Sequence, residues 1–260
     1  MSDFIVEKEL FVTREVVSYT GGALVSGKKD LVDEASYQIC VNGRGAGEMI
    51  CSPWGLQKAF LGYLYLKGYI SGAGDVRAID VDGEHRIVNI TIREYLTEET
   101  GAEDLLIQEE TLWSGQDFTS ETCDDVRLSV LDVLAFSREL EERSALFRRT
   151  GGVHCAAFVR GGQFLSYKED ISRHVAVDKV VGDCLQRKIP MRQGILLCSG
   201  RVPVEILQRV GAMGCSVLIA KSAPTNYSCQ LAQKLGITLI GFARDESFNV
   251  YSHPERVYEV

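Results

Sequence analysis

Residues 194–225, GILLCSGRVPVEILQRVGAMGCSVLIAKSAPT, decide the fold of this chain because they contain two copies of one strand–turn unit, joined by a helix. Apolar runs at 194–198 and 216–220 have the length and composition of buried strands. Each run is followed by a turn of small and basic residues, and the segment 203–213 between them has the apolar spacing of a helix. Buried strands joined by such helices favour parallel pairing with right-handed crossovers. The stretch therefore predicts an α/β sheet.

The same pattern continues on both sides of this stretch. Residues 153–159 and 238–242 are expected to form further strands, and residues 172–186 and 224–235 to form further helices. From about residue 150 onward the sequence thus predicts a single α/β domain. In such sheets ligands bind beyond the carboxyl ends of the strands, where the helices begin.

The first third of the chain predicts a smaller α+β unit. Strands are expected at 4–17 and 36–41, with a hairpin turn in the glycine-rich residues 42–47, and a β-hairpin is expected at 77–93. A mostly apolar helix is expected at 54–67. Ser52 is expected to cap this helix, with Pro53 at its first position.

Residues 96–125 are acidic and mostly polar, and a helix is expected after them at about 129–148. We interpret the acidic stretch as a surface connection that carries Cys123. The sequence therefore divides into a small α+β domain (1–95), an acidic connecting loop (96–128) and an α/β domain (129–260).

The net charge of −8 argues against general nucleic-acid binding. The charge is uneven, because residues 151–260 carry 13 Lys and Arg against 9 Asp and Glu, which favours an anion site there. No apolar run is long enough to span a bilayer, and the charged N-terminus is unlike a signal peptide, so we expect a cytoplasmic protein. The eight cysteines form no C-x-x-C pair and are expected to be reduced and mostly buried, and the histidine spacing predicts no metal site.

Turns at the ends of the predicted strands combine helix caps, for which Ser199 is expected to serve after 194–198, with basic residues. Exposed N–H groups and the helix dipole favour anions at such positions, so these turns predict a site for a phosphorylated ligand. Two alternatives stay open: ordinary helix caps, and a structural set of ion pairs among Asp170, Arg173 and Asp178. The candidate ligand-binding residues are Gly152, His154, Asp170, Arg173, His174, Ser199, Gly200, Arg201, Ser222 and Thr225.

The sequence resembles the FdhD/NarQ family of formate dehydrogenase accessory sulfurtransferases. The matching stretches are residues 41–43, 52–53, 61–63, 150–154, 169–182, 199–202, 221–225 and 236–256. The resemblance implies a cytidine-deaminase-like three-layer α/β fold for the second part of the chain. It also implies binding of the guanine-dinucleotide form of the molybdenum cofactor as cargo, usually by a homodimer. Family members take sulfur from a cysteine desulfurase as a cysteine persulfide and deliver it to the cofactor for formate dehydrogenase.

The resemblance places the cofactor segment on Phe242, Ala243, Arg244, Asp245, Glu246 and Ser247. The carboxylate of Asp245 or Glu246 could accept hydrogen bonds from guanine N1–H and N2–H₂. The family usually has a C-x-x-C pair in a mobile loop, whereas here Cys123 stands at the first position and Val126 at the second. Acidic neighbours on both sides of Cys123 disfavour its thiolate. We therefore expect a sulfur carrier that uses Cys123, with a cofactor-binding chaperone that transfers no sulfur as the alternative. A zinc deaminase is disfavoured because the H-x-E and P-C-x-x-C patterns are absent.

Overall fold

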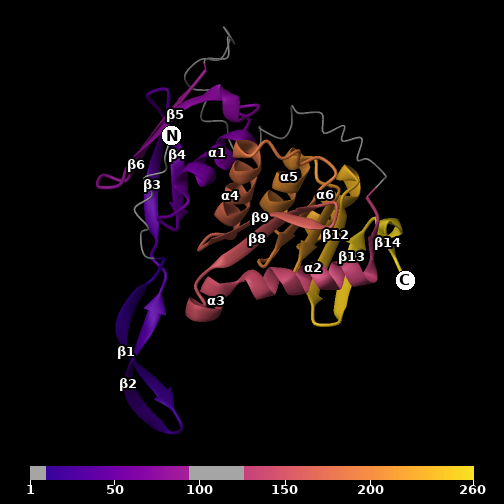
Figure 1. Cartoon of the computed structure of the whole chain (residues 1–260), viewed down its shortest axis with the longest axis horizontal. Helices are drawn as coiled ribbons and strands as arrows, with labels where there is room; N and C mark the ends of the chain where they lie inside the picture. Colours follow the sequence, from indigo (N-terminus) through magenta and orange to yellow (C-terminus); the bar gives the residue numbers. More distant parts are fainter. Residues whose placement is uncertain (1–9, 94–125) are drawn as a thin grey trace.

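The computed structural model describes residues 10–93 and 126–260, which fold into two packed sheets and a projecting arm (Figure 1). The larger sheet has the strand order β13-β12-β11-β10-β8-β9. Its strands are β8 His154–Arg160, β9 Gln163–Asp170, β10 Ile195–Cys198, β11 Val217–Ala220, β12 Thr238–Arg244 and β13 Ser247–Ser252. The helices around it are α2 Val130–Arg143, α3 Ala145–Thr150, α4 Arg173–Gln186, α5 Val204–Met213 and α6 Asn226–Leu235.

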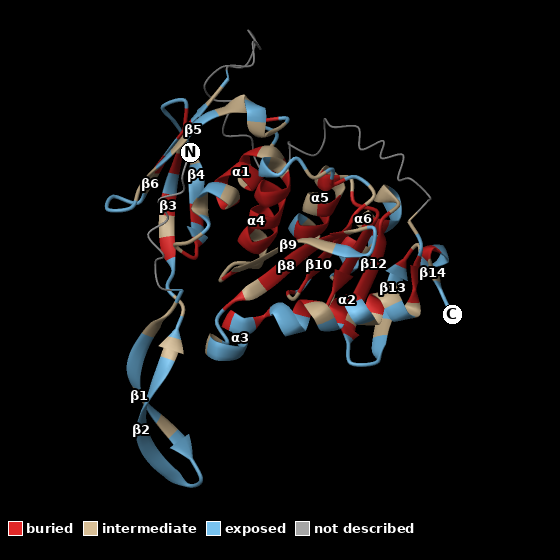
Figure 2. Ribbon diagram, viewed as in Figure 1, coloured by how far each residue is buried: buried red, intermediate tan, exposed pale blue. Residues whose placement is uncertain are grey.

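The larger sheet is the middle layer of three, with one buried cluster on each face, and Figure 2 shows most of the length of its central strands as buried. Alternate residues of a strand point to opposite faces. Leu196 and Leu218 pack with α4 and α5, whereas their neighbours Leu197 and Ile219 pack with α2. The α/β fold predicted from residues 194–225 is therefore confirmed. The predicted helices lie close to their expected bounds, except that the one expected at about 129–148 is broken at Ser144 into α2 and α3.

The predicted parallel pairing holds for β10, β11 and β12 but is wrong for β8, which runs antiparallel to β10. The reason is β9, a strand that the sequence interpretation missed. Gly161 and Gly162 both have positive φ angles, 57° and 74°, and form a two-residue turn between Arg160 and Gln163. Such a Gly-Gly turn is typical of a β-hairpin. Because β9 reverses the chain once more, α4 still begins at the edge where β10 to β12 end.

The smaller sheet has the order β4-β3-β6-β5 and packs one helix, α1 (Leu56–Leu66), in its core. Its strands are β3 Ala35–Val41, β4 Arg44–Cys51, β5 Val76–Asp82 and β6 Ile87–Ile92, with a short helix, η1 Ala73–Asp75, before β5. The predicted hairpin turn is confirmed, because Asn42 and Gly43 connect β3 to β4 with φ angles of 48° and 79°.

The expected cap at Ser52 is wrong, because the helix begins three residues later. Gly55, with a φ of 63°, is the N-cap of α1. Ser52 instead joins the two sheets: its N–H donates to Asp170, and its hydroxyl accepts from the N–H of Ile171 at 3.0 Å. A good capping residue therefore serves a long-range contact here.

Helices α1 and α4 cross with their backbones in contact. A Cβ atom on Gly62 would lie 1.8 Å from the carbonyl oxygen of Asp178, and one on Gly182 would lie 1.9 Å from that of Lys58. Val175 of α4 also belongs to the hydrophobic core of the smaller sheet. The two predicted domains thus share one tightly packed helix pair, and their exact division stays a prediction.

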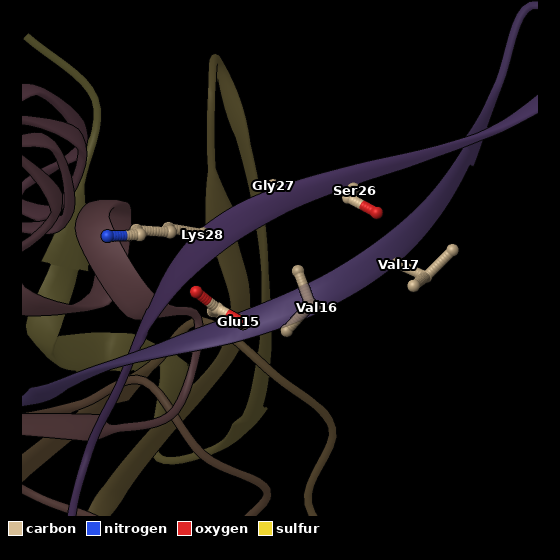
Figure 3. A pocket seen from close by; sticks show the side chains of 6 residues that line it. All are labelled: Glu15, Val16, Val17, Ser26, Gly27 and Lys28. Carbon is tan, nitrogen blue, oxygen red and sulfur yellow. The ribbon is translucent and has the colours of Figure 1, made fainter.

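Strands β1 (Val12–Thr20) and β2 (Ala23–Leu31) form a two-stranded arm that projects from the body (Figures 1 and 2). Side chains of both strands line a shallow hollow of about 420 Å³ (Figure 3). Arg149 holds the base of the arm, because its guanidinium lies 2.7 Å from Asp30 and 3.7 Å from the centre of the Phe11 ring. Across the described part of the chain, no helix is long and apolar enough to cross a membrane.

Candidate functional site

The predicted ligand-binding turns gather at one edge of the larger sheet, called here the carboxyl edge. Strands β9 to β12 end at this edge and β8 begins there. His154 is opposite Asp170 in the register, and Cys198 is opposite both Ala156 and Ala220. Residues up to 42 positions apart in the sequence, such as Ala156 and Cys198, are thereby placed opposite one another.

Backbone hydrogen bonds join the turns after β10 and β11 to the start of the cofactor segment. The N–H of Val202 donates to the carbonyl of Ala223 at 3.0 Å, and that of Thr225 donates back to Val202 at 3.1 Å. The N–H of Phe242 donates to the carbonyl of Ser222 at 3.3 Å. The three segments therefore form one continuous surface, in which Arg201 is exposed.

Two of the three candidate hydroxyls, those of Ser199 and Thr225, have different roles. Thr225 is the N-cap of α6, since its Oγ1 accepts from the N–H of Ser228 at 3.2 Å. The expectation that Ser199 caps α5 is wrong, because the chain stays extended until Pro203, which is the N-cap. The Ser199 hydroxyl accepts from the N–H of Cys155 at 3.0 Å and lies 3.4 Å from His154 Nδ1.

Gly200 allows a close approach of side chains at the centre of the edge. A Cβ atom there would lie 3.1 Å from Cβ of Arg173 and 3.4 Å from His154 Nδ1. Burial, and next the guanidinium of Arg173, lower the pKa of His154. His154 is therefore neutral near pH 7 and stands beside a cation.

Arg173 and His174, at the start of α4, carry buried nitrogen atoms that lack partners. Among the described residues, Arg173 Nε and His174 Nε2 make no hydrogen bond. Burial, followed by the charges of Arg209 and Arg173, lowers the pKa of His174 to about 4. A buried polar group without a partner costs about 1–3 kcal/mol. These two groups make the start of α4 a candidate place for a ligand.

Asp170 lies at the carboxyl edge and is held there by buried hydrogen bonds and an ion pair. It is fully buried, and its oxygens accept from the N–H groups of Ser52 and Ser172 and lie 2.6 Å from Nζ of Lys179. Of the alternative set of ion pairs, Asp178 pairs with Arg209 at 2.7 Å, whereas Arg173 forms no ion pair within the described residues. The alternative of structural ion pairs thus holds for Asp170 and Asp178, and it does not account for Arg173.

The cofactor segment turns sharply at Phe242 and Asp245, whose φ angles are 53° and 54°. Its last part faces α2 across a hollow of about 580 Å³. The sequence interpretation missed the contribution of α2, because only tertiary packing brings this helix to the segment. The hollow is lined by Ser137, Arg138, Glu141, Asp245, Glu246 and Ser247.

Charged and aromatic groups surround this hollow. Lys221, in the turn after β11, forms an ion pair with Glu141 of α2. Arg244 is exposed, and its guanidinium lies 5.5 Å from the centre of the Phe242 ring. The hydroxyl of Ser137 donates to the carbonyl of Ala243, which fixes α2 against the segment.

The glycines before β8 are explained by packing. Gly151 ends α3 with a φ of 69°, which gives the sharp turn that the sequence suggested. A Cβ atom on Gly152 would lie 2.6 Å from a methyl group of Val32 at the base of the arm. Gly152 therefore lies against protein, and its role in ligand binding stays a prediction.

Cys123 lies outside the described residues. The seven other cysteines are free thiols, and five of them are buried. Burial raises the pKa of Cys51, Cys184 and Cys198 to about 12. These three thiols stay protonated at neutral pH and are poor nucleophiles. The described residues also contain no group of three His, Cys, Asp or Glu that could hold a metal ion.

The fold defines a three-layer α/β protein, and the carboxyl edge of its larger sheet gathers basic side chains that are exposed or lack partners among the described residues. The chain belongs to the FdhD/NarQ family, whose sequence profile matches residues 32–258. It is 34% identical to the sulfur carrier protein FdhD of Staphylococcus haemolyticus, over 97% of this chain and 98% of the relative. It is 30% identical to the protein of the same name from Staphylococcus aureus, over 98% and 99% of the two chains. A solved structure from Desulfotalea psychrophila, described as a formate dehydrogenase accessory protein, has the same fold, with a TM-score of 0.77, 24% identity, and coverage of 96% of this chain and all of that one.

Proposed function

We propose that this protein is a cytoplasmic sulfur carrier for formate dehydrogenase, and that its carboxyl edge holds a guanine-dinucleotide form of the molybdenum cofactor as cargo. The names of its relatives support the first part of this proposal. The geometry of the carboxyl edge supports the second part.

The single observation that carries the binding proposal is the pair of buried, unpartnered nitrogens on Arg173 and His174. A guanidinium N–H fits a phosphate oxygen as a charge-assisted donor, and an imidazole N–H can donate to another. Gly200 lets the side chains of Arg173 and His154 pack closely against the turn after β10. The exposed guanidinium of Arg201 adds a cation at the same edge.

The hollow against α2 fits the base end of such a ligand. Asp245 and Glu246 are exposed carboxylates on its wall. A carboxylate accepts two hydrogen bonds, which matches the paired N1–H and N2–H₂ donors of guanine. The ring of Phe242, close to Arg244, supplies an apolar surface beside it.

In the proposed chemistry the thiolate of Cys123 attacks the terminal sulfur of a cysteine desulfurase persulfide. A new S–S bond forms on Cys123, and the desulfurase thiolate leaves. To release that sulfur as sulfide, a second thiolate must attack Sγ of Cys123 and supply the electron pair, which leaves a disulfide. Val126 stands where the family has its second cysteine. We therefore assign this second role to a low-molecular-weight thiol.

A desulfurase and a formate dehydrogenase are the two protein partners that this cycle requires. A homodimer is the assembly expected from the family resemblance. Sedimentation of the purified protein at micromolar concentration tests the dimer, and a monomer at all concentrations would remove it from the proposal.

Calorimetry with GDP tests the binding site. The parent protein is expected to bind GDP, and Arg201→Ala and Arg244→Ala are expected to weaken binding by about tenfold each, as for the loss of one charge-assisted contact. Arg187→Met is the matched control, because Arg187 is exposed at the far end of α4. Absence of GDP binding by the parent would remove the binding site from the proposal.

A persulfide assay separates the sulfur carrier from the alternative, a cofactor-binding chaperone that transfers no sulfur. The replacement of the second loop cysteine by Val126 favours this alternative. The protein is incubated with a desulfurase and cysteine, and bound persulfide is then labelled and located by mass spectrometry. The carrier predicts label on Cys123 that Cys123→Ala abolishes and Cys40→Ala preserves. If Cys123→Ala carries as much persulfide as the parent and still binds GDP, the chaperone is the better description.

A further inference from the structure

The two-stranded arm is the part of the molecule to which the proposed function gives no role. No residue of its strands β1 and β2 is buried, although each strand has nine residues. A two-stranded ribbon by itself is at best marginally stable in water, and it becomes stable when more strands or a second layer cover it. The arm extends beyond the body (Figure 1), so the described body does not supply this cover.

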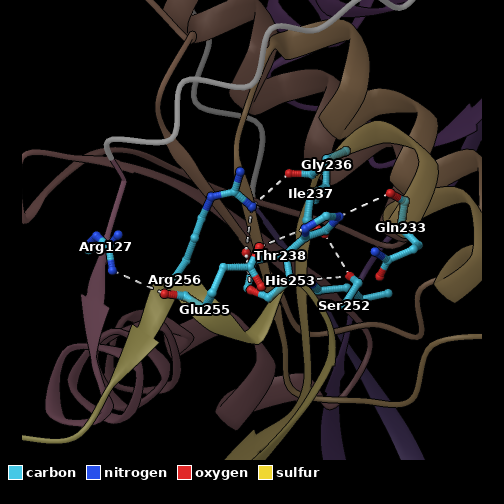
Figure 4. Close-up of polar contacts among 10 residues, drawn as sticks. Arg127, Gln233, Gly236, Ile237, Thr238, Ser252, His253, Glu255 and Arg256 are labelled. Atoms are coloured by element: carbon cyan, nitrogen blue, oxygen red, sulfur yellow. Dashed lines mark hydrogen bonds and ion pairs between the residues drawn. The ribbon is translucent and has the colours of Figure 1, made fainter.

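The C-terminal end, on the far side of the molecule from the arm, is covered by its own chain (Figures 1 and 4). Arg256 is only 4% exposed, and its Nη1 donates to the carbonyl of Gly236 at 2.8 Å and to Oγ1 of Thr238 at 3.1 Å. His253 Nε2 lies 3.1 Å from the carbonyl of Gln233. The periphery of the fold is therefore completed within one chain at this end, in contrast to the arm.

The two faces of the arm differ in charge. Alternate residues of a strand point to opposite faces. On one face, called here the basic face, Arg14 lies directly opposite Lys29. On the other, called here the mixed face, Glu15 lies directly opposite Lys28. Two copies of the basic face would repel each other, whereas two copies of the mixed face can match each acid with a base.

The mixed face also carries the most exposed large apolar side chains of the arm. Val17, Tyr19 and Leu24 are 65%, 72% and 75% exposed, and Tyr19 lies directly opposite Leu24. Residues 16–27, which form the outer half of the arm, include no charged side chain. The mixed face thus combines an apolar surface with one acid and one base, and such a surface is typical of an interaction site.

The charged side chains of the mixed face are open to another molecule. Within the described chain, the side chains of Glu15 and Lys28 form no hydrogen bond or ion pair, and Figure 3 shows them extended beside the hollow without meeting. Rotation by 180° about the length of the arm places β1 of one copy over β2 of another. Glu15 then meets Lys28 of the second copy, and Tyr19 meets its Leu24.

We propose that the mixed face of the arm is the contact between two copies of this chain. Two arms packed face to face form two β layers about 10 Å apart, so each copy covers the apolar residues of the other. A nine-residue strand is about 30 Å long, which gives a contact of the small size found in weak complexes. We expect a dissociation constant of roughly 10 µM. This inference rests on the homodimer of the proposed function and names its interface.

Charge reversal tests the contact, with self-association measured by sedimentation equilibrium. Glu15→Lys and Lys28→Glu each place like charges across the contact, so each is expected to weaken self-association by at least about tenfold. The double variant Glu15→Lys/Lys28→Glu restores opposite charges and is expected to associate like the parent. Lys29→Glu reverses the neighbouring charge on the basic face and serves as the matched control, with the dissociation constant of the parent.

A mixture of the two single variants separates contact between copies from any effect inside one arm. Each single variant keeps like charges within its own arm, but a pair made of one of each has opposite charges across the contact. A fluorophore at the C-terminus, far from the arm, marks Glu15→Lys (Figure 1). Unlabelled Lys28→Glu is expected to bind it at least about tenfold more tightly than unlabelled Glu15→Lys does.

Leu24→Ser removes an apolar contact without a change of charge and is expected to weaken self-association by about tenfold. Parent-like association of both single variants, or a mixture that gains no affinity, would overturn the inference and leave the homodimer with another interface. A parent that stays monomeric at all concentrations would remove the homodimer as well. The persulfide and GDP assays test the rest of the proposed function separately.

Discussion

The crossing of α1 and α4 and the carboxyl edge of the larger sheet both bury charged side chains, and they differ in how those charges are paired. At the crossing, Asp170 pairs with Lys179 at 2.6 Å, and Asp183 lies 3.0 Å from Lys58 and 3.3 Å from Lys168. At the edge, Arg173 starts the same helix α4 and leaves its Nε buried without a partner among the described residues. One helix therefore has a paired face and an unpaired end.

The difference separates charged groups that stabilise the fold from a charged group that is left to bind a ligand. A buried charge that has a partner is costly to disturb, because removal of either partner strands the other in a medium of low dielectric. A buried donor without a partner already destabilises the folded protein. Its removal should therefore lower the affinity for the ligand more than it lowers the free energy of unfolding. Stability and GDP affinity should thus respond to different substitutions along α4.

The largest effect is expected at the glycine of the crossing. Gly182→Ala would put a Cβ atom 1.9 Å from the carbonyl oxygen of Lys58, so the helices must separate. We expect a loss of free energy of unfolding above about 5 kcal/mol, or failure to fold. Urea unfolding measures it, with Gly72→Ala as control, since nothing lies within 4 Å of a Cβ atom there. Equal midpoints for the two variants would mean that the helices do not touch.

The next effect is expected from the buried ion pair. Lys179→Met leaves the fully buried Asp170 without its cation and should cost about 3–5 kcal/mol. The double variant Lys179→Met/Asp170→Asn should recover part of this loss, because the amide is neutral and its oxygen can still accept from a backbone N–H. Thermal unfolding of the parent, Lys179→Met and the double variant measures these differences in stability. A double variant less stable than Lys179→Met would show that the carboxylate tolerates isolation.

At the carboxyl edge we expect a smaller effect, which lowers GDP affinity and leaves the stability of the fold nearly unchanged. Arg173→Met removes a half-buried side chain whose guanidinium forms no ion pair among the described residues, so the free energy of unfolding should change by less than about 1 kcal/mol. GDP binding should weaken by about 10–30-fold, as for a charge-assisted contact. If Arg173→Met instead destabilises the fold and binds GDP like the parent, the comparison between the two regions fails.

The smallest effect is a dependence of binding on pH. Burial lowers the pKa values of His154 and His174, so both are neutral in the free protein near pH 7. A bound phosphate favours their protonated forms, so binding should take up protons and GDP affinity should rise about 2–5-fold from pH 8 to pH 6.5. Calorimetry in buffers of different ionisation enthalpy measures the uptake. His174→Gln should reduce it, and proton release by the parent would contradict the assignment.

The local pattern of apolar residues was enough to predict much of the fold. Strands β10 and β11 and the helices after them have periodicities that depend only on residues close in the sequence. Strand β9 was missed because its few apolar residues do not alternate clearly. Ser52 and Ser199 were misassigned for one shared reason. Each is a good capping residue by type, but a partner more than 40 positions away, Ile171 or Cys155, uses its hydroxyl instead.

The candidate site shows the same limit. Its turns were visible because small or capping residues and a cation follow the strands at 194–198 and 216–220 within a few residues. The wall from α2 and the unpartnered state of Arg173 and His174 depend on packing between distant segments. Sequence therefore located the edge, and only the structure separated its supporting groups from those open to a ligand.

The sharing of α4 between two cores has a consequence for biosynthesis. The core around Phe60 and Leu64 of α1 is completed by Val175, which leaves the ribosome more than 100 residues later. At about 5–20 residues per second, the nascent chain presents an unfinished apolar helix for roughly 5–20 s. During that interval the side of α1 that packs against α4 in the finished protein stays uncovered.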